Sequence, residues 1–138
     1  MSIIDDSVYE GNETFLVILS NQSSGSISDD TATVTITDNE SAPTVTLTTS
    51  GSSIDENWGD SQTLTATLSG ATDETVTVAL DTSGTATEGT DYTDGSGNID
   101  DITISAGATT GTVNFTPTDD SVYEGNESAT ISINGVSG

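Results

Sequence analysis

A short acidic run at residues 119–127, DDSVYEGNE, places four carboxylates within nine positions of a 138-residue chain. Carboxylates this close together repel one another unless a cation lies between them. Ca²⁺ accepts six to eight oxygen ligands in flexible geometry, whereas Mg²⁺ requires a regular octahedron and retains its water. The run therefore predicts a calcium site. Its spacing differs from that of an EF-hand loop, and no helical pattern flanks it.

The chain carries nearly the same run twice. Residues 5–14 read DDSVYEGNET and residues 119–128 read DDSVYEGNES, so nine of ten positions agree at a spacing of 114. Apolar residues then alternate with other residues after both copies, as at Phe15 and Val17 and at Ile131. A period of this length predicts tandem domains rather than the short coils of a solenoid.

The overall composition narrows the chemistry further. The chain has 23 Asp and Glu residues, no Lys, Arg, His or Cys, and a formal charge of −23. Phosphate binding depends on Lys and Arg, so we expect no nucleic-acid partner. Catalytic triads and metal sites built on imidazole or thiolate are excluded. Two carboxylates can hydrolyse glycosides, but no aromatic residues of a sugar cleft accompany these acids, so we expect no enzyme.

The elements that must position these acids are strands. Apolar residues alternate with Thr in TATVTIT (31–37), TVTLTT (44–49), TLTATLS (63–69) and TVTVAL (75–80). Such alternation is typical of half-buried antiparallel strands, with Val34 among the inward-facing residues. Clusters of Gly, Asp, Asn and Ser separate the strands. The sequence predicts an all-β fold, an immunoglobulin-like antiparallel β-sandwich. No apolar run is long enough to insert into a membrane.

The repeat also suggests where the domains divide. We expect residues 1–40 to be the C-terminal part of a first repeat, residues 41–43 a linker, and residues 44–138 a second repeat. At the spacing of 114, Gly138 corresponds to Ser24, so the second repeat lacks a counterpart of the last strand. The prediction is a tandem repeat with incomplete units at both ends.

Three motifs resemble the Calx-beta domain. They are GTATEGTDY (84–92), the DDSVYEGNE run and the Ile-Thr-Asp sequence (36–38) that closes a strand. The family is known from sodium–calcium exchangers, integrin subunits and large bacterial surface proteins. The resemblance implies a seven-stranded immunoglobulin-like sandwich that binds several Ca²⁺ ions at one end.

The resemblance also implies a ligand set. In the second repeat the implied ligands are Glu56, Asp91, Asp119, Asp120, Glu124 and Glu127, with the carbonyl of Val122. In the first repeat they are Asp5, Asp6, Glu10 and Glu13, the carbonyl of Val8, and the closing acids Asp38 and Glu40. Asn39 stands where the family often has a third acid.

These features favour a calcium-rigidified structural repeat of a secreted, extracellular adhesin or cell-surface filament, with neighbouring repeats as its partners. The N-terminus lacks the basic residues of a signal peptide, so the chain is either cytosolic or an internal piece of an exported protein. An alternative is a homo-oligomeric fibre, in which residues 31–40 of one chain complete residues 44–138 of another. Residues 1–24 duplicate residues 115–138, so one copy would be displaced. A calcium-sensing regulatory module is a lesser alternative.

Overall fold

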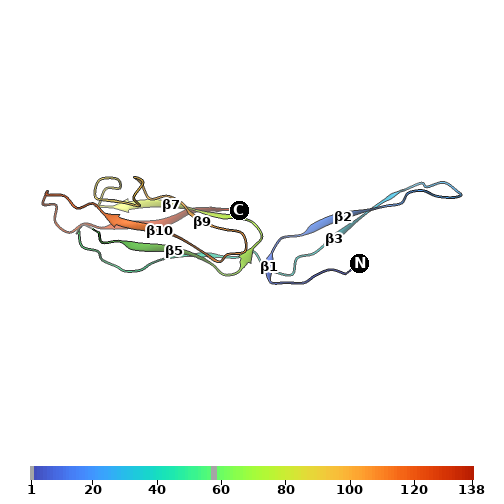
Figure 1. Ribbon diagram of the computed structural model, residues 1–138, viewed down its shortest axis with the longest axis horizontal. Helices are drawn as coiled ribbons and strands as arrows, with labels where there is room; N and C mark the ends of the chain where they lie inside the picture. Colours follow the sequence, from blue (N-terminus) through green and yellow to red (C-terminus); the bar gives the residue numbers. More distant parts are fainter. Residues whose placement is uncertain (1, 57–58) are drawn as a thin grey trace.

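The computed structural model describes residues 2–56 and 59–138, and every regular element within these ranges is a β-strand. The all-β prediction is confirmed. The molecule is elongated: a β-sandwich forms one half, and a narrow hairpin extends away from it (Figure 1). Residues 37–44 connect the hairpin to the sandwich without regular structure.

One sheet of the sandwich has four strands in the order β4-β5-β10-β8. Along β5, Leu64, Ala66 and Leu68 are buried while the Thr residues between them are only half-buried, as alternation predicts. The strands are β4 (Val45–Thr49), β5 (Gln62–Leu68), β8 (Tyr92–Thr93) and β10 (Thr110–Pro117).

The second sheet has three strands in the order β11-β7-β9, all antiparallel. They are β7 (Val76–Gly84), β9 (Ile102–Ile104) and β11 (Ala129–Ser137). β11 pairs with β7 along one edge, and within the described residues no strand pairs with its other edge. An unpaired edge presents free backbone donors and acceptors to any strand that can reach it.

The hydrophobic core lies between these two sheets. Val78, Ile102 and Ile104 are fully buried, and burial of each such side chain stabilises the fold by about 1.5–3 kcal/mol. The Tyr92 ring stacks on Phe115 with the ring centroids 4.7 Å apart. Because these two aromatic residues lie next to the loops that follow β7 and β10, the core fixes the ends of those loops.

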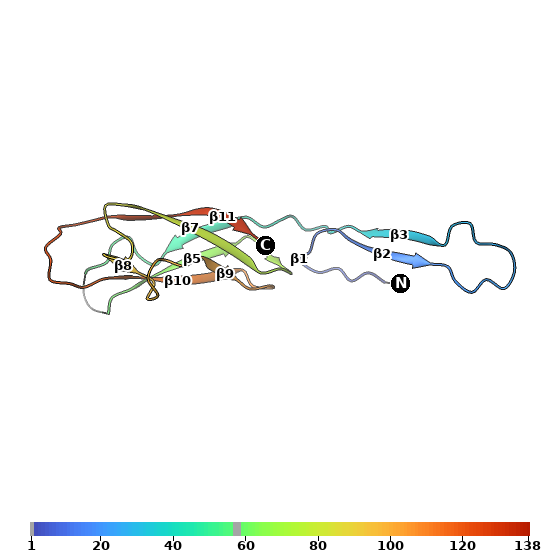
Figure 2. The ribbon, with the colours of Figure 1, turned by 90° about the horizontal axis from the view of Figure 1, so that it is seen from above.

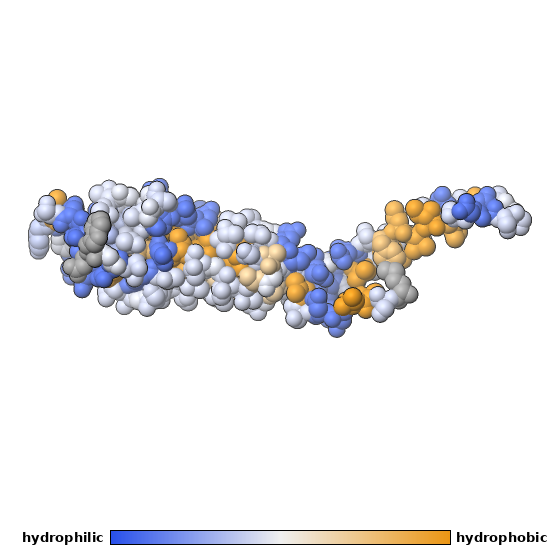
Figure 3. Space-filling model, in the orientation of Figure 1, coloured by the Kyte–Doolittle hydropathy of each residue, from blue (hydrophilic) through white to orange (hydrophobic). Residues whose placement is uncertain are grey.

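The hairpin pairs β2 (Glu13–Ile18) with β3 (Thr31–Ile36) in antiparallel register, with Phe15 opposite Val34. Among the described residues no second sheet covers it, and Leu16 and Ile18 are about 60% exposed. Val34, predicted to face inward, is 39% exposed for the same reason. Figure 3 shows the resulting apolar surface on the hairpin. A two-stranded hairpin is marginally stable alone.

A short parallel bridge joins the hairpin to the sandwich. β1 (Val8–Tyr9) pairs with β6 (Ala71–Thr72), the turn between β5 and β7. The Asp73 N–H donates to the Tyr9 carbonyl at 3.2 Å. Figure 2 shows β1 lying between the hairpin and the sandwich. The first acidic run is therefore docked against the near end of the sandwich.

Candidate metal centre

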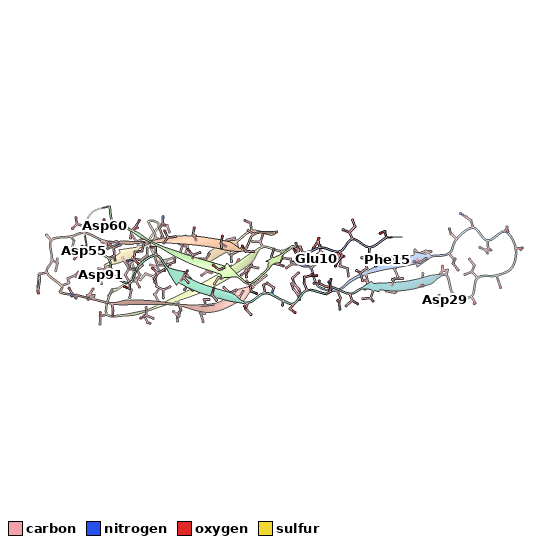
Figure 4. All side chains as sticks on the ribbon, turned by 90° about the horizontal axis from the view of Figure 1, so that it is seen from below. Glu10, Phe15, Asp29, Asp55, Asp60 and Asp91 are labelled. Atoms are coloured by element: carbon pink, nitrogen blue, oxygen red, sulfur yellow. The ribbon has the colours of Figure 1, made fainter. Side chains whose placement is uncertain are left out.

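Three loops at the far end of the sandwich bring carboxylates together. They are the loops between β4 and β5, between β7 and β8, and between β10 and β11. Figure 4 labels Asp55 and Asp91 at this end and Glu10 near the hairpin, so the two acidic regions lie at opposite ends of the sandwich.

Five of the predicted ligands converge at this end. Glu56, Asp120 and Glu124 each place one carboxylate oxygen within 4.8 Å of the others, and Asp91, Glu124 and Glu127 do the same. Glu124 belongs to both groups and links them. The donors are all carboxylate oxygens, and most of these side chains are exposed. This donor set fits Ca²⁺, which binds many oxygen ligands without a fixed geometry.

The loop from β7 to β8 is tied to the end of the acidic run. The Ser128 carbonyl accepts hydrogen bonds from the N–H groups of Thr85 and Ala86 at 2.9 and 3.1 Å. The Thr85 hydroxyl accepts the Ser128 N–H at 2.9 Å. Asp91 accepts the Thr87 N–H at 2.6 Å, which closes this loop on itself. These bonds explain how the GTATEGTDY motif places Asp91 beside Glu127.

The acidic run has its own internal turn. Asp120 accepts the N–H of Val122 at 2.6 Å, a side-chain turn that Asp favours. Asp119 belongs to neither carboxylate group. Val122, predicted to offer its carbonyl, has a 61% exposed side chain. Their roles as ligands stay predictions.

The crowded carboxylates alter one another's proton affinity. Partial loss of hydration, and then the negative charges of Asp91 and Asp120, raise the pKa of Glu124. Partial loss of hydration and the charge of Asp91 likewise raise the pKa of Glu127. The folded protein therefore holds these two carboxylates at an electrostatic cost, which a bound proton or cation relieves.

The first acidic run forms a different arrangement. Asp38 accepts the N–H groups of Glu10 and Gly11 at 2.9 and 2.7 Å, and that of Glu40 at 3.0 Å. Its own N–H donates to Asn12. Hydrogen bonds from the backbone, that of Glu40 first, lower the pKa of Asp38. Asp38 thus fastens the end of β3 to the acidic run.

The other acids of this region lie around Asp38. The charges of Asp6 above all, and then of Glu13 and Asp73 among others, raise the pKa of Glu10. A hydrogen bond to Asp38, with a smaller contribution from the charge of Asp5, raises that of Glu40. Among the described residues, no three carboxylates here meet as closely as at the far end. A calcium site in this first copy stays a prediction.

Two acids with structural roles were not among the predicted ligands. Glu88 accepts hydrogen bonds from the Ile99 N–H and the Thr82 hydroxyl, and so holds the loop after β7 against the sheet. In the sequence, only the place of Glu88 inside the GTATEGTDY motif indicated a structural role for it. Asp94 accepts hydrogen bonds from the N–H and hydroxyl of Ser96 and from the Asp100 N–H.

The pKa shifts predict an unusual response to acid. Without metal, we expect melting temperature to rise as pH falls from neutral toward the ordinary pKa of Glu. The folded state, with raised pKa values at Glu124 and Glu127, then binds more protons than the unfolded state. At lower pH stability should fall again, because Asp38 and Asp94 have lowered pKa values. Thermal melts in EDTA across this pH range test the direction of the change in melting temperature. A melting temperature that decreases steadily from neutral pH would contradict the prediction.

The Calx-beta domain model matches residues 1–40 and again residues 38–137. No curated protein matches the sequence, and no solved structure does. In the described ranges no helix has the length and apolar character needed to cross a membrane. The two matches together span nearly the whole sequence, and the sandwich carries its clustered acids on the loops at one end, so the chain belongs to the Calx-beta domain family.

Proposed function

We propose that this protein is a calcium-binding structural module of a secreted adhesin or surface filament. The observation that carries the proposal is the position of Glu124 in two carboxylate groups drawn from three loops. Calx-beta domains are non-enzymatic modules associated with calcium binding, and they are typically extracellular. A formal charge of −23 without one basic side chain also suits a protein whose counter-charges are divalent cations.

The proposed ligands are Glu56, Asp91, Asp120, Glu124 and Glu127. Calcium supplies no reaction here; its charge offsets the repulsion between carboxylates that raises the pKa of Glu124. Because these residues lie on three separate loops, a shared cation would hold the loops as one rigid end. In a protein built of neighbouring repeats, this end is where one repeat would meet the next.

Calorimetric titration of the full chain with calcium tests this function. We expect calcium to bind more tightly than magnesium, and Glu124→Gln to weaken calcium binding by about tenfold or more. Glu74→Gln is the matched control, since Glu74 is an exposed acid outside both carboxylate groups. A wild-type chain that binds no calcium, or a Glu124→Gln chain that binds it unchanged, would refute the proposal.

The second candidate function is a fibre subunit joined by head-to-tail strand exchange. A cleft between β4 and β11 is lined by Leu47, Phe115, Ile131 and Ile133, and it reaches the carboxylates of the far end. The unpaired edge of β11 borders this cleft. A strand added to that edge would cover the cleft and extend the sheet, which is how edge strands capture peptides.

The pairing within the hairpin supports β3 as the strand that is exchanged. β2 corresponds to the beginning of β11 at the spacing of 114, and β3 pairs with β2. If β3 of a second chain took the same register on β11, Val34 would lie opposite Ala129. Its half-exposed side chain would then enter the cleft. Asp38 would accept the N–H groups of Glu124 and Gly125 in place of those of Glu10 and Gly11.

A pair of single-cysteine chains tests the exchange, since the protein has no cysteine of its own. We expect V34C and A129C chains, mixed in calcium and oxidised, to form a disulfide-linked dimer. Light scattering of the wild-type chain should show concentration-dependent growth. A strictly monomeric chain in calcium, with no cross-link, would rule the exchange out.

A further inference from the structure

The two copies of the acidic run adopt the same local conformation. Asp6 accepts the Val8 N–H at 2.8 Å in the first copy, and Asp120 accepts the Val122 N–H at 2.6 Å in the second. The glycine five residues after each aspartate has a positive φ, +72° in the first copy and +79° in the second. The two runs thus share this turn and this glycine conformation as well as nine of ten residues.

The surroundings of the two copies differ. Val8 and Tyr9 are half-buried because they pair with Ala71 and Thr72. The equivalent residues of the second copy have no such partner among the described residues. Val122 is 61% exposed and Tyr123 is 96% exposed. The second copy thus exposes the residues whose equivalents in the first copy are paired with Ala71 and Thr72.

The two halves lie at opposite ends of the sandwich. The turn that contains Ala71 and Thr72 faces the hairpin, beside β1 (Figure 2). The loop of residues 118–128 forms the opposite tip, at the far left of Figure 1. A contact between one molecule's tip and another molecule's turn is therefore head-to-tail, and it leaves both remaining ends free for the next contact.

We propose that Val122–Tyr123 of one molecule pairs in parallel with Ala71–Thr72 of a second molecule. The Tyr123 carbonyl then accepts the Asp73 N–H of the second molecule, as the Tyr9 carbonyl does now. The proposal extends the strand exchange above: when residues 119–138 of one chain replace residues 5–24 of another, both contacts form together. The strand exchange and the tip contact join the same two molecules in the same orientation.

This contact brings acids of two molecules together. Asp73 follows Thr72, which pairs with Tyr9, and its N–H donates to the Tyr9 carbonyl, so Asp73 lies beside the first acidic run. In the assembly, Asp73 would face Glu124 of the neighbouring molecule, and Glu124 belongs to both carboxylate groups of that molecule. Each chain has a formal charge of −23, so the two ends repel unless cations lie between them. The contact should therefore form in calcium and come apart in EDTA.

The molecule's own first run competes for the turn, and the experiment must release it. Glu10→Pro removes one of the N–H groups that Asp38 accepts and leaves Ala71, Thr72 and Asp73 unchanged. We mix an A71C chain that also carries E10P with a V122C chain and oxidise the mixture in calcium. A disulfide-linked heterodimer is the expected product, and it should be lost in EDTA. It should also decrease strongly when the V122C chain carries E124P, the matched substitution.

A chain with both V8C and A71C provides the geometric control, because its internal disulfide reports the contact already present. If this chain closes but the mixed chains do not cross-link, the inference is wrong. If V34C cross-links to A129C but V122C does not cross-link to A71C, the strand exchange is supported and the tip contact is overturned. The reverse pattern supports the tip contact and refutes the exchange, so the two failures are distinguishable.

Discussion

Removal of calcium should lower the melting temperature of this protein by about 10–20 °C. A ligand that binds only the folded state, present at one hundred times its dissociation constant, stabilises by about 2.7 kcal/mol. For a domain of about 100 residues, each kcal/mol corresponds to about 4–8 °C. One cation shared through Glu124 would oppose repulsion among Glu56, Asp91, Asp120 and Glu127 together.

Circular dichroism melts in calcium and in EDTA provide the measurement. At the same calcium concentration, a Glu124→Gln chain that binds calcium about tenfold more weakly should keep only about half of this stabilisation. The Glu74→Gln control should keep the full response to calcium. Amide hydrogen exchange should show lost protection first in the loops that carry Glu56, Asp91 and Glu124. Equal melting temperatures with and without calcium would remove the structural role proposed for the ion.

Substitution of Gly84 by Ala should strongly destabilise the sandwich. A Cβ at this position would lie 2.0 Å from the Ser128 carbonyl oxygen, and Gly84 has a φ of +136°, which L-residues rarely adopt. Crowding and backbone strain each cost about 1–3 kcal/mol, so we expect a loss of about 3 kcal/mol or more. Ser128 directly follows Glu127, so calcium binding should weaken as well.

Urea denaturation compared with Gly135→Ala measures the effect. Gly135 lies in β11, where an added Cβ would meet only the Ala79 Cβ at 4.0 Å, an ordinary contact distance. The control should change stability by less than about 1 kcal/mol. If Gly84→Ala denatures at the wild-type urea concentration and binds calcium normally, the hydrogen bonds that the N–H groups of Thr85 and Ala86 donate to the Ser128 carbonyl do not position the site.

Much of the fold was predictable because its strands follow local rules. The alternation in residues 63–69 and 75–80 fixed which side chains of β5 and β7 face the core, and Leu64, Val76 and Val78 are buried as expected. The same reasoning failed for Val34, since alternation shows which face is apolar but not whether a second layer covers it. That depends on residues elsewhere in the chain.

The carboxylate cluster shows the same division. The acidic run could be identified from its own residues, because four neighbouring carboxylates favour a cation whatever surrounds them. Asp119, however, belongs to the run but to neither carboxylate group. Asp91 lies outside the run, yet it joins one group because the loop that carries it is hydrogen-bonded to Ser128. Nothing in the spacing along the chain distinguishes these two residues, since the distinction arises from hydrogen bonds between loops.

The sequence by itself therefore determined the chemistry of this protein: all-β strands from alternating Thr, and an acidic, base-free set of oxygen ligands in two matching runs. Only the tertiary structure decided which acids meet. The sandwich brings Glu56 and Asp91 to Glu124, while the first run docks on Ala71–Thr72 and gives its backbone N–H groups to Asp38. The physical reason is that residue types specify what each group can bind, but distances between loops are fixed by the packed core and the register of its strands.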